Sequence, residues 1–332
     1  MFITRIYDSN KKKVKFYDLQ KRKYTQLPHL SKIYVPPAYT DVRMSCNPDS
    51  KVLAYGFDSK GRKQYVYNKQ FIEEQNELKF SDLRNFGKKI KRIRADCNRC
   101  ITDYIKSGNS LDKLMSRDLQ TAVIIHLIDK CNFRIGNEKY KDLYNSYGVT
   151  TLNSVHISET PNNVKICFIG KKGVENSAVV SNRFISQILR HLKRVNENRE
   201  YLFCYTDSNN LVCRITERQI NRYLKKYDPS ITVKMFRTWA ANNMLLRELL
   251  KMEMPNTQRQ TRKNIQNAIK KSARLMHHTS GVSKKSYMNN EILSMYENSP
   301  QEFVEGLKRY KNSNGRLPDT DTLFSRLLND LN

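Results

Sequence analysis

The segment from His277 to Tyr287 combines side chains that could attack and hold a phosphodiester. Tyr287 provides a phenol, and His278 provides an imidazole nine residues before it. Lys284 and Lys285 lie between the two. A phenol titrates near pH ~10 and is a poor nucleophile at neutral pH unless neighbouring cations activate it. A lone tyrosine on a basic helix is more often an ordinary surface residue, so the rest of the chain must supply the other groups of a reaction site.

The charge balance of the chain indicates a polyanionic partner. Its 332 residues include 60 Lys and Arg against 32 Asp and Glu, which gives a formal net charge of +28. Such an excess favours nucleic acid or an anionic membrane surface. A membrane protein would need a long apolar span or a basic helix rich in Trp and Phe, and the longest mainly apolar stretch, Leu119 to Ile128, is far too short to cross a bilayer. We therefore expect double-stranded DNA as the partner and no membrane association.

The cysteines indicate reduced thiols rather than a metal site. The chain has seven, an odd number, and Cys97-x-x-Cys100 has no second CxxC or HxxxH pair to complete a zinc site. The amino terminus lacks the apolar core of a signal peptide. We therefore predict an intracellular, DNA-associated protein without a cofactor. The many Asn, Lys, Ile and Tyr residues indicate an AT-rich genome, which together with the small size favours a large DNA virus over a bacterium as the source. The location would then be the virion or a viral replication site in the host cytoplasm.

Strand and helix signals predict an α+β fold of two domains, residues 1–80 and 81–332. Short β-type runs separated by turn residues make the first domain small and β-rich. Helical spacing begins near Phe80, and residues 181–330 are again helical, with a capping box at Thr216-x-x-Gln219. The predicted strands of the first domain are Phe2–Tyr7, Val14–Tyr17, Val52–Phe57 and Gln64–Tyr67.

The second domain is predicted to be mainly helical with a small β-sheet. In its first helix apolar residues repeat along one face, while basic residues such as Arg94 surround the other, either solvated or near DNA. Residues from Leu119 to Cys131 are apolar nearly all round, which predicts a buried helix. Strand signals return at three places: 148–152, 155–157 and 164–169.

A transesterification at phosphorus needs a nucleophile, donors for the non-bridging oxygens and an acid for the leaving alkoxide. The sequence contains no convincing cluster of Asp and Glu for divalent metals. It also lacks a phosphate-binding Gly-x4-Gly-Lys loop, because Lys165 stands where the first glycine before Gly170-Lys171 belongs. A metal-free site would use arginine forks and an imidazole instead.

Several segments resemble, in family order, the motifs of the poxvirus-type and bacterial small type IB DNA topoisomerases. Together they cover most of residues 1–290. The segments are Val35–Val42 and Gly56–Tyr67 near the amino terminus, Phe133–Tyr140, Gly148–Leu152, Phe168–Lys171, Lys234–Trp239 and His278–Tyr287.

The resemblance implies a role for each of five residues. Tyr287 would form a 3′-phosphotyrosyl bond with DNA. Arg134 and Arg237 would hold the scissile phosphate, and His278 would donate to a non-bridging oxygen. Lys171 would protonate the 5′-hydroxyl leaving group. Guanidinium forks suit this chemistry because they stabilise the charge of a five-coordinate transition state and remain charged at any working pH.

The resemblance also implies contacts with DNA outside the scissile phosphate. Gln64, Tyr65 and Tyr67 match positions that read the major groove, where glutamine can pair with adenine. The alternative for Tyr65 and Tyr67 is a strand face that packs inward. Three further residues match phosphate contacts: Tyr140, Lys234 and Asn242.

The sequence departs from the family pattern at three positions. His277 stands where the family has glycine, and Ser280 stands where it has proline. His278 is preferred to His277 as the catalytic histidine because of its spacing from Tyr287. Met235 replaces an acidic residue in the segment before Arg237.

The function predicted from these observations is that of a type IB DNA topoisomerase. Such an enzyme would be a monomeric, C-shaped clamp that nicks one strand, relaxes supercoils and religates without ATP or metal. A tyrosine site-specific recombinase is one alternative, although Lys234 stands where recombinases have histidine. A non-catalytic basic DNA-packaging protein is the other, but it does not explain the ordered set of five residues.

Overall fold

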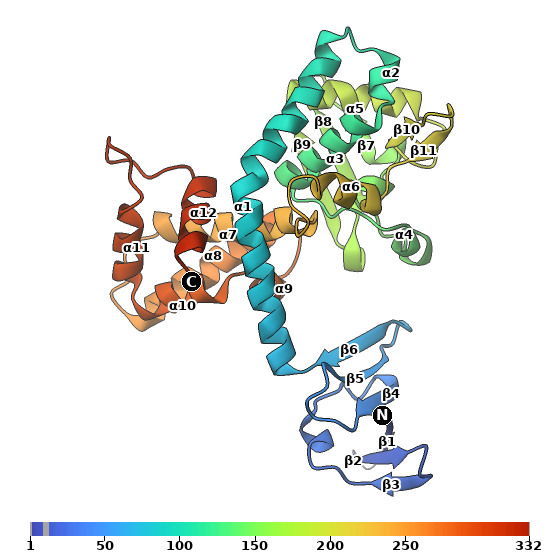
Figure 1. Cartoon of the computed structure of the whole chain (residues 1–332), viewed down its shortest axis with the longest axis vertical. Coiled ribbons are helices and arrows are strands. Elements are labelled where there is room, and N and C mark those ends of the chain that lie inside the picture. The colour runs from blue at the N-terminus through green and yellow to red at the C-terminus, as the bar shows by residue number, and fades with distance from the viewer. Residues whose placement is uncertain (1, 9–12, 332) are drawn as a thin grey trace. The chain divides into compact units, whose positions relative to one another are not determined.

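The computed structural model describes residues 2–8 and 13–331, and Figure 1 shows its elements. The chain divides into two compact units, Met1–Lys79 (unit 1) and Phe80–Asn332 (unit 2). Unit 1 is rich in strands, whereas unit 2 is mainly helical with two small sheets. The predicted α+β class is therefore confirmed. No helix formed by the described residues is long and apolar enough to cross a membrane.

Six antiparallel strands form one sheet in unit 1, in the spatial order β3-β2-β1-β4-β5-β6. The four predicted strands are confirmed, and β3 and β4 are additional. β3 is too short for an alternation to be recognised, and β4 mixes charged residues into its apolar pattern. The strands are β1 (Phe2–Asp8), β2 (Lys13–Asp18), β3 (Lys23–Thr25), β4 (Thr40–Ser45), β5 (Val52–Phe57) and β6 (Lys63–Tyr67).

A buried arginine fixes the proline-containing loop that precedes β4. Arg5 donates hydrogen bonds to the carbonyl oxygens of Val35 at 2.6 Å, Pro36 at 3.0 Å and Tyr39 at 3.0 Å. These bonds satisfy the two terminal nitrogens of a charged side chain that is largely removed from water. The apolar core of unit 1 lies beside it and contains Ile3, Leu30, Val35, Val42, Met44 and Ala54.

Helix α1 (Lys69–Lys106) begins earlier than the sequence predicts. The helix was expected near Phe80, because the polar residues before it lack an apolar repeat. Asn68 supplies the missing start signal, since its side-chain oxygen accepts a hydrogen bond from the backbone N–H of Gln70 at 2.9 Å. The apolar face expected further along the helix is confirmed by buried Ile90, Ile93, Cys97 and Ile101.

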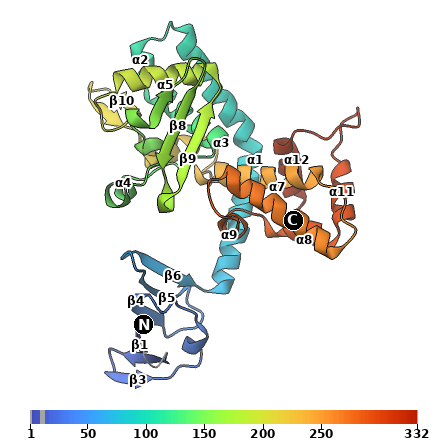
Figure 2. The ribbon, with the colours of Figure 1, turned by 180° about the vertical axis from the view of Figure 1, so that it is seen from behind.

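In unit 2, α7 (Lys234–Lys251) packs against α3 (Arg117–Cys131), α8 (Gln258–Leu275) and α12 (Thr320–Asp330). β7, β8 and β9 form an antiparallel sheet, and Figure 2 shows β8 and β9 with α5 beside them. The remaining helices are α2 (Leu111–Leu114), α4 (Glu138–Tyr144), α5 (Arg183–Val195), α6 (Glu217–Leu224), α9 (Ser280–Ser286), α10 (Asn290–Asn298) and α11 (Pro300–Lys308). The strands are β7 (Ile157–Glu159), β8 (Val164–Ile169), β9 (Glu175–Val180), β10 (Cys204–Thr206) and β11 (Val212–Arg214).

Local signals in unit 2 predicted some elements correctly and others wrongly. β8, the buried helix α3 and the capping box of Thr216 and Gln219 are confirmed. The strand expected at 148–152 is wrong, because Val149–Thr151 forms a 3₁₀ turn. The strand expected at 155–157 begins only at Ile157, after another 3₁₀ turn. The hairpin of β10 and β11 interrupts a region predicted to be wholly helical.

Candidate active site

Arg237 is held between the ends of two other helices. Only 4% of its surface is exposed, and it lies in the first turn of α7. Its Nη1 donates to the carbonyl of Asn132, which follows α3, and its Nη2 donates to the carbonyl of Met276, which follows α8, at 2.8 Å. The buried Nε has no partner among the described residues, so it is free to donate to an anionic oxygen.

The end of α8 sets the position of the two histidines. His277 lies in the left-handed region at φ +52°. Its N–H donates to Arg274 O at 3.1 Å, and the N–H of His278 donates to Ala273 O at 3.1 Å. This pair of bonds is the Schellman arrangement, whose left-handed position favours glycine. Histidine at position 277, where the family pattern has glycine, therefore causes backbone strain. The motif ends α8 and turns the chain at His278.

The imidazole of His278 stacks on the phenol ring of Tyr287. The ring centroids are 4.9 Å apart and the planes differ by 12°. Both ring nitrogens of His278 are buried and have no hydrogen-bond partner among the described residues. Burial, followed by the charges of Arg237 and Arg134, lowers the pKa of His278 to about 4. The imidazole is therefore neutral at pH 7 and has an unused N–H for an incoming group.

Tyr287 caps the end of α9, and a buried amide fixes its backbone. Its N–H donates to Ser283 O at 3.0 Å, while its carbonyl accepts from Asn242 Nδ2 at 2.8 Å. Asn242 Oδ1 in turn accepts from the N–H of Asn289 at 2.8 Å. Asn242 is 1% exposed, and its amide is occupied in positioning the Tyr287 segment; its direct contact with a DNA phosphate stays a prediction.

The phenol of Tyr287 is surrounded by positive charge. Burial alone raises its pKa, but the charges of Arg237 and Arg134, with hydrogen bonding from both, outweigh burial and lower the pKa below its usual value. The guanidinium carbon of Arg237 lies 5.5 Å from the ring centroid. The ionised, nucleophilic form of Tyr287 is stabilised by this arrangement.

Close contact between two backbone segments positions Arg134. The Arg134 carbonyl accepts from the N–H of Val149 at 2.9 Å. Gly136, at φ +97°, lies directly against Gly148. A Cβ at Gly148 would be 2.4 Å from Gly136 N and 2.7 Å from Arg134 O, so a side chain there would displace the arginine segment. This approach explains why residues 148–152 leave the extended conformation predicted for them.

Lys171 lies in the tight turn between β8 and β9. Gly170 and Gly173 form the turn, and Lys172 between them takes a left-handed conformation at φ +65°. Although the Lys171 side chain reaches solvent, desolvation by its surroundings and then the charge of Arg134 lower its pKa. The charges of Arg134 and Tyr287 both act on the Lys171 ammonium, which indicates that the hairpin brings Lys171 to the same site. The structure therefore brings all five predicted catalytic residues together.

The predicted DNA-contact residues of unit 1 lie on both faces of β6. Tyr65 and Tyr67 are 46% and 42% exposed and stack at 5.9 Å, so the alternative that they pack inward is wrong. Lys63 lies over the Tyr65 ring at 5.4 Å. Gln64 points to the opposite face, where its Nε2 donates to Asp58 Oδ2 at 2.9 Å.

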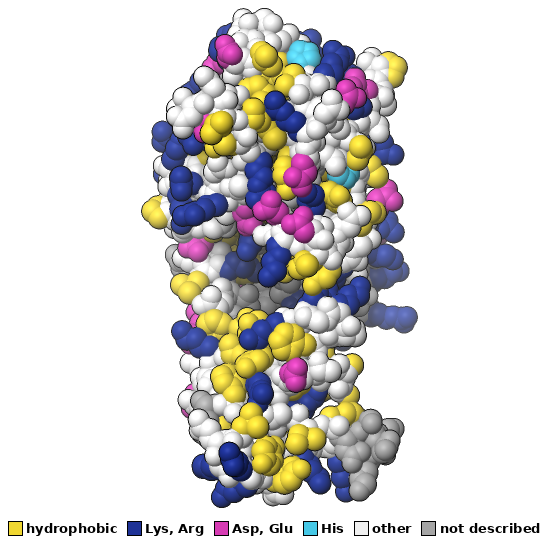
Figure 3. All heavy atoms as spheres, turned by 90° about the vertical axis from the view of Figure 1, so that its right-hand side faces the viewer, with side chains coloured by type: hydrophobic (Ala, Val, Ile, Leu, Met, Phe, Trp, Pro, Cys, Tyr) yellow, Lys and Arg dark blue, Asp and Glu magenta, His cyan; other side chains and the backbone are white. Residues whose placement is uncertain are grey.

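In unit 2 two of the predicted contact residues are exposed. Lys234 opens α7, and its charge acts on Lys171. Tyr140 is 51% exposed on α4, a helix without buried residues. A basic pocket of about 750 Å³ lies beside the Arg134 segment; its cationic lining residues are Lys139, Arg214, Arg218, Arg222 and Lys225. Figure 3 shows Lys and Arg side chains over much of the face drawn.

Two residues near the site were not assigned a role by sequence reasoning. Asn132, whose carbonyl holds Arg237, ends α3 in the left-handed region at φ +56°. Asparagine at that place is a recognisable helix-end signal, although its partner is not. Met235, which departs from the family pattern, is a buried part of the apolar core.

Among the described residues no group of three or more His, Cys, Asp and Glu side chains could hold a metal ion.

Comparison with the sequences of known proteins identifies the family of this chain. Residues 68–314 match the catalytic core of eukaryotic DNA topoisomerase I. The chain is 32% identical to DNA topoisomerase 1B of Acanthamoeba polyphaga mimivirus over 285 residues, which is 84% of this chain and 82% of that protein. It is 28% identical to DNA topoisomerase I of Monkeypox virus over 249 residues, 74% of this chain and 73% of that one.

A plant enzyme shows the same core within a longer protein. DNA topoisomerase 1 of Daucus carota is 28% identical over 262 residues, 73% of this chain but 32% of the plant protein. Topoisomerases are thus matched across viruses and a plant, and the predicted viral origin fits the viral relatives. The chain belongs to the DNA topoisomerase I family, and within it to the small type IB enzymes of the poxvirus kind.

Proposed function

We propose that this type IB topoisomerase cleaves one strand of duplex DNA through Tyr287. The phenolic oxygen attacks the scissile phosphorus, and a 3′-phosphotyrosyl bond forms as the bond from phosphorus to the 5′-oxygen breaks. The phenol proton leaves to solvent, and Lys171 gives a proton to the departing 5′-oxygen. Religation is the reverse attack by that hydroxyl. Since the covalent link conserves the bond energy, the cycle needs no ATP.

Arg134, Arg237 and His278 stabilise the five-coordinate transition state in this proposal. The unpartnered Nε of Arg237 and the unpartnered ring nitrogens of His278 support it, because buried donors without partners are costly unless a ligand satisfies them. The single observation that carries the proposal is the arrangement around a partly buried tyrosine: the Tyr287 ring stacks on His278 at 4.9 Å, and the guanidinium carbon of Arg237 lies 5.5 Å from the ring centroid. Preorganised donors around developing charge commonly supply the largest part of catalysis.

We also propose that the enzyme acts as a monomer and that units 1 and 2 close around the duplex from opposite sides. The exposed rings of Tyr65 and Tyr67 on unit 1 and the exposed Tyr140 and Lys234 on unit 2 give each unit groups that suit DNA. Hydroxyl-radical footprints with the whole protein should protect both faces of the duplex. Protection of one face alone would contradict the clamp.

Replacing the nucleophile tests the chemistry directly. The wild-type protein should form a covalent adduct with a labelled suicide duplex and relax supercoiled plasmid without exchanging strands between sites. The Tyr287→Phe variant should form no adduct and relax nothing, while its affinity for the duplex changes little. Tyr34→Phe, at a tyrosine that is 77% exposed, is a matched control that should keep full activity. Adduct formation by Tyr287→Phe would contradict the assignment, and peptide mapping of the adduct would identify the true nucleophile.

A further inference from the structure

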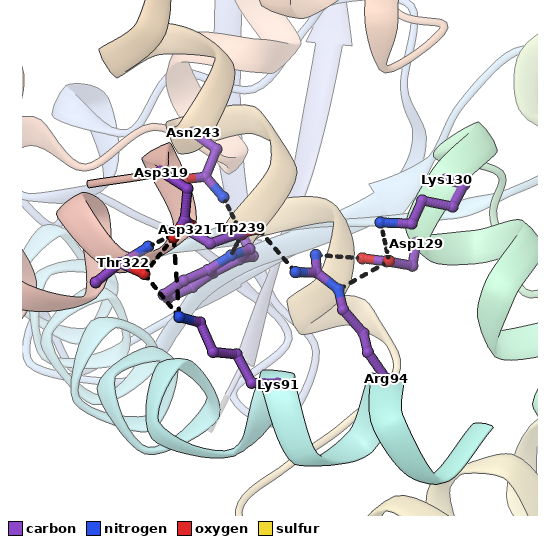
Figure 4. A network of polar contacts seen from close by, with 9 residues as sticks. All are labelled: Lys91, Arg94, Asp129, Lys130, Trp239, Asn243, Asp319, Asp321 and Thr322. Carbon is purple, nitrogen blue, oxygen red and sulfur yellow. Dashed lines mark hydrogen bonds and ion pairs between the residues drawn. The ribbon is translucent and has the colours of Figure 1, made fainter. Parts of the chain in front are cut away.

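The carboxylate of Asp321 joins three elements of unit 2 (Figure 4). Asp321 lies in the first turn of α12, where a negative charge suits the helix dipole. Its Oδ1 accepts hydrogen bonds from Trp239 Nε1 and, at 2.7 Å, from Asn243 Nδ2, and both donors belong to α7. Its Oδ2 accepts from Arg94 Nη1 on α1 at 2.7 Å. One side chain of α12 therefore ties α7 to α1.

Arg94 extends this link to the helix that leads to Arg134. Its Nε and Nη2 donate to the two oxygens of Asp129 at 2.9 and 2.7 Å, a bidentate pair. Asp129 is 6% exposed and lies near the end of α3, shortly before Arg134 in the chain. The pair of carboxylates, with Arg94 between them, fixes α3 relative to α12 and α7.

Trp239 has little freedom to find another acceptor. It is 1% exposed, and its ring packs on Phe324 of α12 at 4.7 Å and on Phe86 of α1 at 5.7 Å. A Cβ at Gly87 would lie 2.6 Å from the indole ring, so glycine is required for this approach. Without Asp321 the indole N–H would be buried and unsatisfied, which is unfavourable. The ring or α7 itself would have to move.

The helix α7 that Asp321 holds also carries two residues of the reaction site. Trp239 follows Arg237 by two residues, and Asn243 follows Asn242, whose amide holds the Tyr287 carbonyl. Arg237 also donates to Asn132, at the end of the helix that Asp129 anchors. We propose that Asp321 is a positioning residue for strand cleavage, which sets α7 and α3 so that Arg237 and Arg134 meet the same phosphate. This inference rests on the proposed roles of those arginines, and α12 lies beyond the residues that match the family core.

Single-turnover cleavage by the full chain tests the proposal. With saturating enzyme and a suicide duplex, Asp321→Ala should cleave about 10- to 100-fold more slowly, because small misplacements of catalytic groups have effects of this size. The dissociation constant for the duplex should change by less than about threefold, since the exposed DNA-contact groups are untouched. Asn243→Leu removes one α7 donor to Asp321 and keeps a side chain of similar size, so it should also slow cleavage. Combined with Asp321→Ala it should slow cleavage no further, because that bond is already lost.

A control in the same turn separates positioning from helix stability. Asp319→Ala removes the cap of α12, which accepts from Thr322 N at 3.0 Å, but it leaves every contact with α7. It should cleave at the wild-type rate. Since the chain has one tryptophan, its fluorescence reports the contact: emission should shift in folded Asp321→Ala and stay unchanged in Asp319→Ala.

Three results would overturn the proposal: a folded Asp321→Ala variant that cleaves at the wild-type rate, an equal loss in Asp319→Ala, or additive losses in the double variant. The Tyr287→Phe variant in the same assay tests the nucleophile separately. Cleavage that depends on Tyr287 but not on Asp321 would contradict only the positioning role of Asp321.

Discussion

At the scale of single residues, the site separates nucleophile activation from leaving-group protonation. Arg237 and Arg134 favour the ionised phenol of Tyr287, while desolvation and then the charge of Arg134 lower the pKa of Lys171 and make it a better acid. One positive environment therefore assists both halves of the reaction. His278 adds no further charge, because its pKa is lowered to about 4.

If Lys171 is the acid, its loss should depend on the leaving group. Lys171→Ala should slow cleavage of ordinary DNA by roughly 10²- to 10⁴-fold. A duplex with sulfur in place of the 5′-bridging oxygen should restore most of the rate, because a thiol with a pKa near ~8.5 leaves without a proton. Single-turnover assays on both duplexes give the comparison. Equal losses on the two substrates would show that Lys171 only binds the phosphate.

The neutral imidazole of His278 predicts a pH dependence of stability. The folded pKa is about 4 against an ordinary value of 6.5, so the unfolded chain binds the proton more readily. Stability should therefore fall as pH falls from about 6.5 towards 4. His278→Gln keeps a donor but removes this titration, and it should lose less stability than wild type between pH 7 and about pH 5 in urea unfolding. The same loss in both proteins would place the His278 pKa near its ordinary value.

At the scale of elements, Gly136 and Gly148 allow the segment of Arg134 to lie against residues 148–149. Gly148→Ala should destabilise the fold by about 1–3 kcal/mol and slow cleavage, because the new methyl group meets the backbone of Gly136 and Arg134. Gly306→Ala is the matched control, since nothing lies within 4 Å of its Cβ in helix α11. It should stabilise by about 0.5–1 kcal/mol. Urea denaturation measures both changes, and a neutral Gly148→Ala would contradict the close packing.

The sequence predicted those elements whose signals are local. β8, α3 and the Thr216 capping box depend on alternation, on apolar composition and on a four-residue motif. The turn at 149–151 was missed because it depends on packing against Gly136, a contact between segments. The two strands of unit 1 that the sequence does not predict are β3, which has three residues, and β4, where Asp41 and Arg43 interrupt the apolar pattern.

The same distinction between local signals and contacts between distant segments applies to the candidate site. The five candidate catalytic residues are those that the family resemblance implies, and the structure brings them together. The sequence predicts Arg94 on an outer face, solvated or near DNA, yet it pairs with Asp129 and Asp321, 35 and 227 residues away. Asn242, which the resemblance implies as a phosphate contact, is buried against the Tyr287 turn, 45 residues away. Partners at such separations leave no pattern in a single sequence.

At the scale of the whole molecule, the net charge of +28 governs DNA binding. Each phosphate neutralised releases counterions, so a binding constant based on six to ten contacts should fall roughly 10³- to 10⁵-fold between about 50 and about 200 mM salt. Lys234→Ala should lower the slope of log K against log salt by about one. Lys308→Ala, whose ammonium pairs with Glu305 at 2.6 Å, should leave the slope unchanged. Titrations in a Tyr287→Phe background avoid cleavage, and a shallow slope for both would contradict an electrostatic interface.

The stacking of His278 on Tyr287 has a consequence for the fidelity of rejoining. With an imidazole at 4.9 Å and a guanidinium carbon at 5.5 Å, the phenol ring has little torsional freedom about its bond to Cβ. In the proposed covalent state, the 3′ end of the broken strand would inherit this restriction, while the 5′ end would be free to turn with the duplex. The 3′ end linked to Tyr287 would therefore keep one position. The returning 5′-hydroxyl would meet the phosphorus at that position, and the original strand would be rejoined.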